Sequence, residues 1–288
     1  MDWPERLGAA IDYLEDNLAG DIDIAEAARR AVCSPFYFQR LFAIVTGMTV
    51  GEYVRKRRLT LAASDLASGN AKVIDVALSY GYDSPDAFTR AFRTMHGVTP
   101  QAAREPGTPL VACPRVSFHI ELKGGIDMDY RVIEKPGFQV AVTTRRFTTE
   151  NDRNFRDIPK WWQAFMATPD WGTMLSLTGN APGKVTGSEM LGICFADDKP
   201  VDFAYGIAVE LPEGSGAGNF EKKAVPAATW AVFSCTLADL QDVTRRIFSE
   251  WFPSVPFEHD DKPELEVYLP GGQGPAMKCE IWIPVVRK

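Results

Sequence analysis

The sequence predicts two domains. The first is all-α and made of two helix-turn-helix units, and the second is α+β and made of two pseudo-symmetric β-α-β-β repeats. Two observations carry this prediction: a gapless repeat in the first hundred residues, and short β-type runs that replace helical spacing from Met128 onward. The length of 288 residues suits about two domains. We expect domains at 1–106 and 127–288, joined by a Pro- and Gly-rich linker at 107–126.

The N-terminal repeat appears when the chain is shifted by 50 residues against itself. Identical residues then coincide in nine pairs, which are Ile24/Ile74, Ala27/Ala77, Ser34/Ser84, Pro35/Pro85, Phe38/Phe88, Arg40/Arg90, Phe42/Phe92, Gly47/Gly97 and Thr49/Thr99.

Each copy has the layout of two short helices joined by a turn. Ser34 or Ser84 serves as the N-cap of the second helix, and proline follows at a position where its missing N–H costs nothing. Gly47 or Gly97 ends that helix. This arrangement predicts a helix-turn-helix in each copy.

The second helix of the first copy is amphipathic, with its apolar face predicted to be core. Its outward side chains include types that read base edges, since Gln pairs with adenine and Arg with guanine. They are Phe36, Tyr37, Gln39 and Arg40. Packing against a neighbouring helix remains the alternative for the two aromatic residues, and a surface ion pair remains the alternative for the arginine.

The second copy presents fewer base-reading types, so we expect mostly DNA-backbone contacts there. Its outward residues are Asp86, Ala87, Thr89, Arg90 and Arg93, and the capping Ser34 and Ser84 are further candidate DNA-contacting residues. Asp86 also suits the helix N-terminus electrostatically. A helix of about 25 Å predicted over 52–68 would set the two copies about one DNA turn apart.

The net charge of −7 does not exclude DNA binding, because phosphate contacts need only a local basic patch. Residues 29–58 hold seven basic residues and one acid, Glu52. The alternative interpretation is a solvated cationic surface. The patch, the repeat and the base-reading side chains together predict a double-stranded DNA partner.

Two stretches resemble the DNA-binding domain of the AraC/XylS family: SPFYFQRLFAIVTGMTVGEYVRKRRLTLA and VIDVALSYGYDSPDAFTRAFRTMHGVTP. The resemblance implies a regulator, expected to be an activator, that binds promoter DNA and has RNA polymerase as a further candidate partner. The family's base-contacting positions fall on Phe36, Gln39 and Arg40, and then on Pro85, Asp86, Thr89 and Arg90. Pro85 and Asp86 depart from the polar or longer donors of many members.

The C-terminal half reads as strands at 128–134, 139–144, 190–195, 203–211, 229–235, 265–269 and 278–285, with helices at 156–167 and 237–251. The segments 136–142 and 226–232 are similar and support two repeats. Glu266 alternates with apolar neighbours, so we expect its carboxylate among aromatics, where an organic cation would bind. The alternative is that Glu266 faces solvent.

The stretches IPKWWQAF, FAYGIAVEL, VPAATWAVF, LEVYLP and CEIWIPV resemble GyrI-like small-molecule-binding domains. The resemblance implies a pocket with Glu266 as its acidic residue and a lipophilic or cationic effector. The expected pocket aromatics are Trp161, Trp162, Tyr205, Trp230 and Tyr268.

We therefore expect a cytoplasmic, ligand-responsive transcription regulator rather than an enzyme. Scattered cysteines and well-separated histidines predict neither disulfides nor a metal site, and no cofactor or membrane contact is expected. Two alternatives stay open for the C-terminal domain. It could hydrolyse a reactive electrophile, with Glu266 as base and Tyr205 as donor, or bind a protein such as gyrase.

Overall fold

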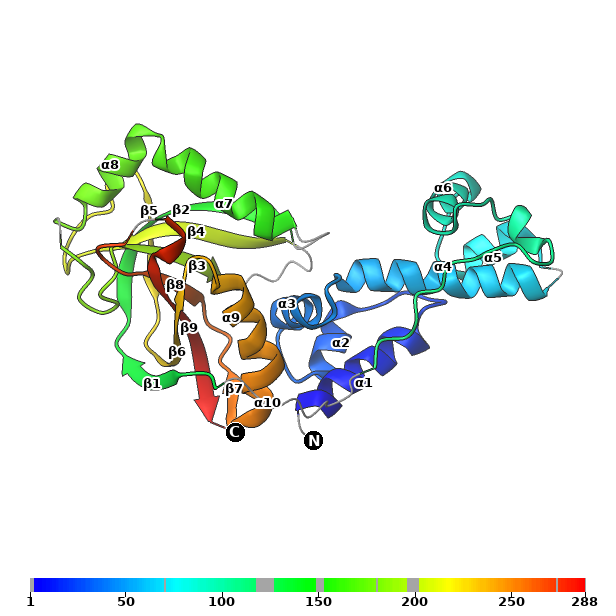
Figure 1. Cartoon of the computed structure of the whole chain (residues 1–288), viewed down its shortest axis with the longest axis horizontal. Helices are drawn as coiled ribbons and strands as arrows, with labels where there is room; N and C mark the ends of the chain where they lie inside the picture. Colours follow the sequence, from blue (N-terminus) through cyan, green and yellow to red (C-terminus); the bar gives the residue numbers. More distant parts are fainter. Residues whose placement is uncertain are drawn as a thin grey trace. The chain divides into compact units, whose positions relative to one another are not determined.

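The computed structural model describes residues 3–69, 71–117, 127–148, 153–179, 181–195, 202–272 and 274–287. The chain divides into two units, residues 1–120 and 121–288. We call them the helical unit and the sheet unit and describe each by itself (Figure 1).

The helical unit contains both predicted helix-turn-helix pairs, α2–α3 and α5–α6. A first helix that the sequence did not predict, α1, precedes them. The elements are α1 (Trp3–Asp16), α2 (Ile24–Arg30), α3 (Pro35–Thr46), α4 (Val50–Ser68), α5 (Val73–Ser79), α6 (Pro85–His96) and the 3-10 turn η1 (Ala102–Arg104).

The predicted caps of α3 and α6 are confirmed. The Ser34 hydroxyl accepts from the Tyr37 amide at 3.3 Å, and the Ser84 hydroxyl accepts from the Ala87 amide at 3.4 Å. Gly47 and Gly97 end these helices in the left-handed region, with φ of 70° and 74°, where a Cβ would be strained.

Helix α4 belongs to the cores of both copies. Near its start, Tyr53 is fully buried and its ring lies 5.4 Å from that of Phe42 in α3. Farther along, Leu59 and Leu66 pack in one cluster with Phe88 of α6. With 19 residues, α4 is about 28 Å long. The predicted spacer is therefore a helix whose two ends are each anchored by packing.

Residues 107–117, which we call the strap, lie against the helical unit. Cys113 donates its backbone N–H to the Thr60 hydroxyl at 2.9 Å, and Val116 donates its own to Tyr53 Oη at 3.1 Å. The Val111 amide donates to His96 Nδ1 at 3.2 Å. The first part of the expected linker 107–126 is thus bonded to α4 and α6, and residues 118–126 lie outside the described part.

The sheet unit is a nine-stranded antiparallel sheet in the order β1-β6-β9-β8-β3-β4-β2-β5, with β7 paired to β9. The strands are β1 (Tyr130–Lys135), β2 (Phe138–Thr148), β3 (Met190–Phe195), β4 (Asp202–Glu210), β5 (Glu221–Val225), β6 (Ala228–Thr236), β7 (Phe257–His259), β8 (Glu264–Tyr268) and β9 (Lys278–Arg287). The remaining elements are α7 (Arg153–Met166), α8 (Pro169–Ser176), α9 (Leu240–Arg246), the π-helix η3 (Ile247–Trp251), α10 (Phe252–Ser254) and η4 (Gly274–Ala276).

The strand order reads symmetrically from its centre, because β8 and β3 are the middle pair and β9/β4, β6/β2 and β1/β5 follow outward. The predicted β-α-β-β repeats are confirmed as β2-α7-β3-β4 and β6-α9-β8-β9, each preceded by one further strand. The sequence prediction missed β5, β7 and α8. The two repeats are therefore related by a pseudo-two-fold axis that passes between β8 and β3, where the two halves of the sheet meet.

Side chains alternate along each strand, so the two faces of the sheet carry different sets of residues. One face holds an apolar cluster that includes Val140, Leu191, Leu265 and Trp282. The opposite face carries Tyr205, Glu266 and Tyr268, and it receives side chains of α7 and η3. The candidate ligand site lies on this second face.

Candidate DNA-binding helices and ligand site

The outward face of α6 lies as the sequence predicts. Ser84, Asp86, Arg90 and Arg93 are exposed, and Thr89 is half-buried. The opposite face is core, since Phe88 and Phe92 have no exposed surface. Amphipathic spacing therefore placed these side chains correctly, while contact of any of them with bases stays a prediction.

The corresponding face of α3 differs from the prediction at two positions. Phe36 and Arg40 are half-buried, but Tyr37 is only 5% exposed and Gln39 only 9%. The Gln39 amide folds back along the helix and donates to the Pro35 carbonyl at 3.1 Å. Helical spacing does not reveal this local bond, which Gln39 would have to give up in order to pair with a base.

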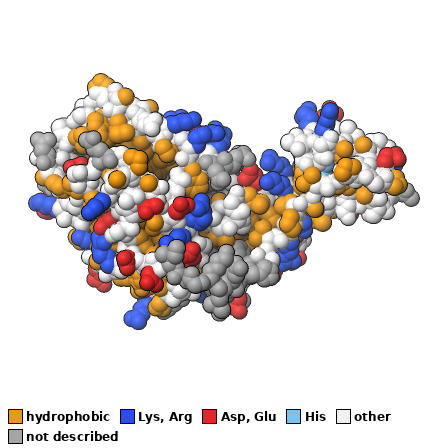
Figure 2. All heavy atoms as spheres, viewed as in Figure 1, with side chains coloured by type: hydrophobic (Ala, Val, Ile, Leu, Met, Phe, Trp, Pro, Cys, Tyr) orange, Lys and Arg blue, Asp and Glu red, His pale blue; other side chains and the backbone are white. Residues whose placement is uncertain are grey.

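The predicted basic patch is only partly directed to solvent. Arg57 bonds to Glu15, and Arg58 donates to the Leu18 carbonyl at 2.8 Å and to the Gly20 carbonyl at 2.5 Å. These two arginines hold the end of α1 against α4. Among their neighbours, Arg55 is exposed and Lys56 half-buried. Figure 2 shows Lys and Arg side chains of the helical unit gathered over the first half of α4 and over α6.

The candidate ligand site centres on Glu266, which is half-buried rather than turned to solvent. Tyr205 Oη donates to Glu266 Oε2 at 2.5 Å, and Tyr268 Oη donates to the same oxygen at 2.9 Å. Two strands supply the group, since Tyr205 lies in β4 and the other two residues lie in β8. Strand β3 lies between these two strands in the sheet. The carboxylate is therefore held by two phenols at the junction of the repeats.

Gly192 of β3 makes room for this cluster. It is the register partner of Glu266, and a Cβ on it would overlap the Tyr205 hydroxyl and lie 2.5 Å from Glu266 Oε2. A larger residue would displace both groups. The sequence prediction missed Gly192, because the requirement arises only when β8 and β3 are paired.

Helix α7 brings two tryptophans to the cluster. Trp162 Nε1 donates to Tyr205 Oη at 3.0 Å, and its ring lies 5.1 Å from that of Tyr268. The Trp161 ring lies 6.3 Å from that of Tyr205. Both residues are half-buried, and a relay of donors runs from Trp162 through Tyr205 to the carboxylate.

The two phenols remain protonated donors. Burial and, next, the negative charge of Glu266 raise the pKa of Tyr205 well above its ordinary value, and the same two causes raise that of Tyr268. Each hydroxyl therefore keeps its proton to share with the carboxylate. An acidic group ringed by aromatic faces attracts a cation and disfavours an anion.

The placement of Trp230 corrects the sequence prediction. Trp230 has no exposed surface and packs in the apolar cluster on the face opposite Glu266, with its ring 5.8 Å from that of Trp282. Strand alternation decides this: Trp230 pairs with Pro284 and Ile133 in register, two strands away from β8. It belongs to the core and not to the ligand site.

Among the described residues, no group of three or more His, Cys, Asp and Glu side chains is arranged to hold a metal ion. None of the helices in the described part of the chain is both long and apolar enough to cross a bilayer.

Two family models match the chain. A helix-turn-helix domain matches residues 27–106, and a GyrI-like small molecule binding domain matches residues 128–286, more than half of the chain.

Named relatives match the helical unit. The regulatory protein SoxS of Salmonella typhimurium is 36% identical over 104 residues, 36% of this chain and 97% of SoxS. The HTH-type transcriptional activator AarP of Providencia stuartii is 35% identical over 92 residues, 32% of this chain and 68% of AarP.

Among solved structures, SAV2435 bound to tetraphenylphosphonium is similar over 55% of this chain and 94% of its own, with 16% identity and a TM-score of 0.44.

Proposed function

Because this chain is a DNA-binding transcription regulator of the AraC family with a GyrI-like small-molecule binding domain, we propose that it activates transcription from a promoter in response to an organic cation. The cation binds at Glu266, and the signal is read out through promoter binding or contact with RNA polymerase. This takes place in the cytoplasm.

The double hydrogen bond of Tyr205 and Tyr268 to one carboxylate oxygen is the observation that carries the proposed ligand class. A carboxylate held in this way among four aromatic residues offers charge and π faces to the same ligand, and a lipophilic cation uses both. A ligand that approaches Glu266 competes with the Trp162–Tyr205 bond, so binding should move the Trp162 indole and change its fluorescence.

The ligand class is tested with tetraphenylphosphonium as the cationic probe and triphenylphosphine oxide as a neutral probe of similar shape. Glu266→Gln keeps the size of the side chain but removes its charge. We expect this variant to bind the cation at least tenfold more weakly, a loss of about 1.4 kcal/mol, while binding of the neutral probe changes little. Equal affinity of Glu266→Gln and the unmodified chain for the cation would overturn the proposal.

We propose that α3 and α6, the second helices of the two copies, both contact bases. Their repeat relationship and the exposure of Arg90 and Asp86 on α6 support this proposal. DNase footprinting on promoter DNA should show protection over about two turns of the duplex. Arg90→Ala should weaken protection of one half of that site. Arg287→Ala, an exposed arginine of the sheet unit, is the matched control and should leave the footprint intact.

Activation is the proposed direction because 92 residues of this chain are 35% identical to a transcriptional activator, AarP. In vitro transcription from the footprinted promoter should rise when the protein and the cation are both present. Protection of the promoter with a fall in transcript would instead identify a repressor.

The hydrogen bond that Tyr205 donates to Glu266 also favours a second candidate function, hydrolysis of a reactive electrophile. Glu266 would act as general base and a phenol as proton donor. Turnover of an electrophile that disappears in Glu266→Gln would support this candidate, and the absence of turnover across a panel of epoxides and activated esters would remove it.

A further inference from the structure

Two cysteines face each other across adjacent strands on the same side of the sheet as Glu266. Cys235 of β6 and Cys279 of β9 are register partners in an antiparallel pair, so both side chains point to one face. Cys279 is also the register partner of Tyr268, which binds Glu266. Both cysteines are free thiols.

The strand pairing sets the separation of the two thiols. Directly opposed residues in an antiparallel pair have Cβ atoms about 4.5–5.5 Å apart, against about 3.5–4.5 Å in a disulfide. This spacing lies at or beyond the upper end for an S–S bond and suits one atom that binds both sulfurs. Seven consecutive register pairs join β6 to β9, so the pair is held in place before any ligand arrives.

We propose that Cys235 and Cys279 form a dithiol site for a trivalent organoarsenical, a soft electrophile that is satisfied by two sulfurs. The arsenic of R–As=O forms one bond to each sulfur, both S–H bonds break, and the oxygen leaves as water with the two protons. No electrons are exchanged with an outside reagent, and the product R–As(S-Cys)2 is neutral.

The surroundings of the pair favour a neutral product. Burial, followed by the negative charges of Glu266 and Asp239, raises the pKa of Cys279 to about 11. The same two carboxylates act on Cys235. A monovalent soft ion such as Ag⁺ would leave two thiolates with a net negative charge beside those carboxylates, which is costly in a buried site. The arsenical product, in contrast, adds no negative charge to the site.

Access begins at Cys235. This residue is partly exposed, whereas Cys279 is 1% exposed. The arsenical therefore meets Cys235 first, and ring closure onto Cys279 follows within the sheet. Because closure is intramolecular, the adduct should resist an excess of a free monothiol, which removes arsenic from single cysteines.

The test uses the full chain with phenylarsine oxide in the presence of excess glutathione. We expect one phenylarsenic adduct per chain by intact mass, and a fall in titratable thiols of the denatured adduct from five to three. Cys235→Ser should abolish the adduct, and Cys113→Ser, which removes a cysteine of the strap, should retain it. Since Cys279 is buried, Cys279→Ala is included with a thermal melt to confirm that the variant folds.

Three results would overturn the proposal: no glutathione-resistant adduct on the unmodified chain, an adduct that persists in Cys235→Ser, or an adduct that is lost equally in Cys113→Ser. The outcome is independent of the proposed cation response, because Glu266→Gln leaves both thiols in place and should still form the adduct.

Discussion

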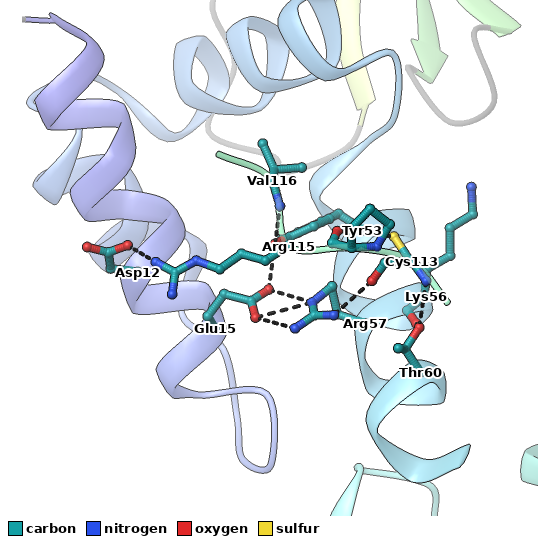
Figure 3. A network of polar contacts seen from close by, with 10 residues as sticks. Asp12, Glu15, Tyr53, Lys56, Arg57, Thr60, Cys113, Arg115 and Val116 are labelled. Atoms are coloured by element: carbon teal, nitrogen blue, oxygen red, sulfur yellow. Dashed lines mark hydrogen bonds and ion pairs between the residues drawn. The ribbon is translucent and has the colours of Figure 1, made fainter. Parts of the chain in front are cut away.

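Arg57 of α4 forms a bidentate ion pair with Glu15 of α1. Arg57 Nε lies 2.9 Å from Glu15 Oε1, and Arg57 Nη2 lies 2.8 Å from Glu15 Oε2. Their side chains are 12% and 9% exposed. Tyr53 Oη donates to the same carboxylate at 2.5 Å (Figure 3). The pair is therefore shielded from water and satisfied by hydrogen bonds, unlike the exposed ion pairs elsewhere on the helical unit.

The strap continues this network. Arg57 Nη1 donates to the Cys113 carbonyl at 2.8 Å, and Arg115 forms an ion pair with Asp12 (Figure 3). The backbone that leads toward the sheet unit is thus bonded to α1 and α4, the two helices whose contact Glu15 and Arg57 hold.

Acid should weaken the helical unit through Glu15. Burial raises the pKa of Glu15, but the hydrogen bonds from Arg57 and Tyr53 and the charge of Arg57 outweigh it, so the pKa lies below the ordinary 4.5. A carboxyl whose pKa is lowered by folding stabilises the fold above its unfolded value and loses that contribution as pH falls through its folded value. Urea unfolding followed by far-UV circular dichroism should show a falling midpoint below about pH 4.5.

Glu15→Gln is the matched variant for that experiment. It should be less stable than the unmodified chain at pH 7, because it leaves Arg57 without its charged partner, and the difference should shrink toward about pH 3. Six of the seven tryptophans lie in the sheet unit, so fluorescence provides an internal reference that Glu15→Gln should not move. An unchanged difference between the two proteins across the pH range would contradict the assignment.

Gly192→Ala should impair ligand binding more than stability. The new methyl group takes the space of the Tyr205 hydroxyl and of Glu266 Oε2, so both groups of the ligand site must shift. We expect the affinity for the cation to fall at least tenfold. The free energy of unfolding, measured by thermal melting, should fall by less than the binding free energy does. Gly216→Ala, where a Cβ meets nothing within 4 Å, is the control and should bind normally.

Thr49→Ala should destabilise the helix that joins the two cores. The Thr49 hydroxyl accepts from the Glu52 amide at 3.1 Å, and Glu52 accepts from the Thr49 amide at 3.0 Å, a reciprocal cap. Its loss should cost about 1 kcal/mol in unfolding free energy. Thr94→Ala on the exposed side of α6 should stay within about 0.5 kcal/mol, and an equal loss in both variants would argue against the cap.

Arg40→Ala should reduce specific DNA affinity by about 1–3 kcal/mol if Arg40 contacts guanine in the major groove. The loss should be confined to sites that carry the cognate base pair. Binding measured on operators with single base changes checks this, and a uniform loss on every sequence would identify a phosphate contact instead.

Several features of the helical unit follow from local sequence alone. Ser-Pro and Gly at a 50-residue period predicted α3 and α6 with their caps, because capping depends on a few neighbouring residues. The outward side of α6 followed from its helical period. The burial of Gln39 did not, because its bond to Pro35 is one of several rotamer choices that the sequence leaves open.

In the sheet unit, alternation along 265–269 predicted that the Glu266 carboxylate lies among aromatics, and the structure places it beside Tyr205 and Tyr268. Trp230 was assigned to the ligand site by resemblance, but strand order and pairing place it on the other face. The polar strand β5 (Glu221–Val225) was missed because an edge strand needs no apolar run to be stabilised by its partner.

The amino-acid sequence determined the period, the caps, the two-domain division and the chemistry of the Glu266 segment, since each depends on residues close together in the chain. Only the tertiary structure decided that Gly192 opens space for Tyr205 and Glu266, that Arg57 is bound to Glu15 instead of facing DNA, and that Cys235 meets Cys279. These partners lie from 13 to 74 residues apart, and pairing register and helix packing, which local spacing does not encode, bring them together.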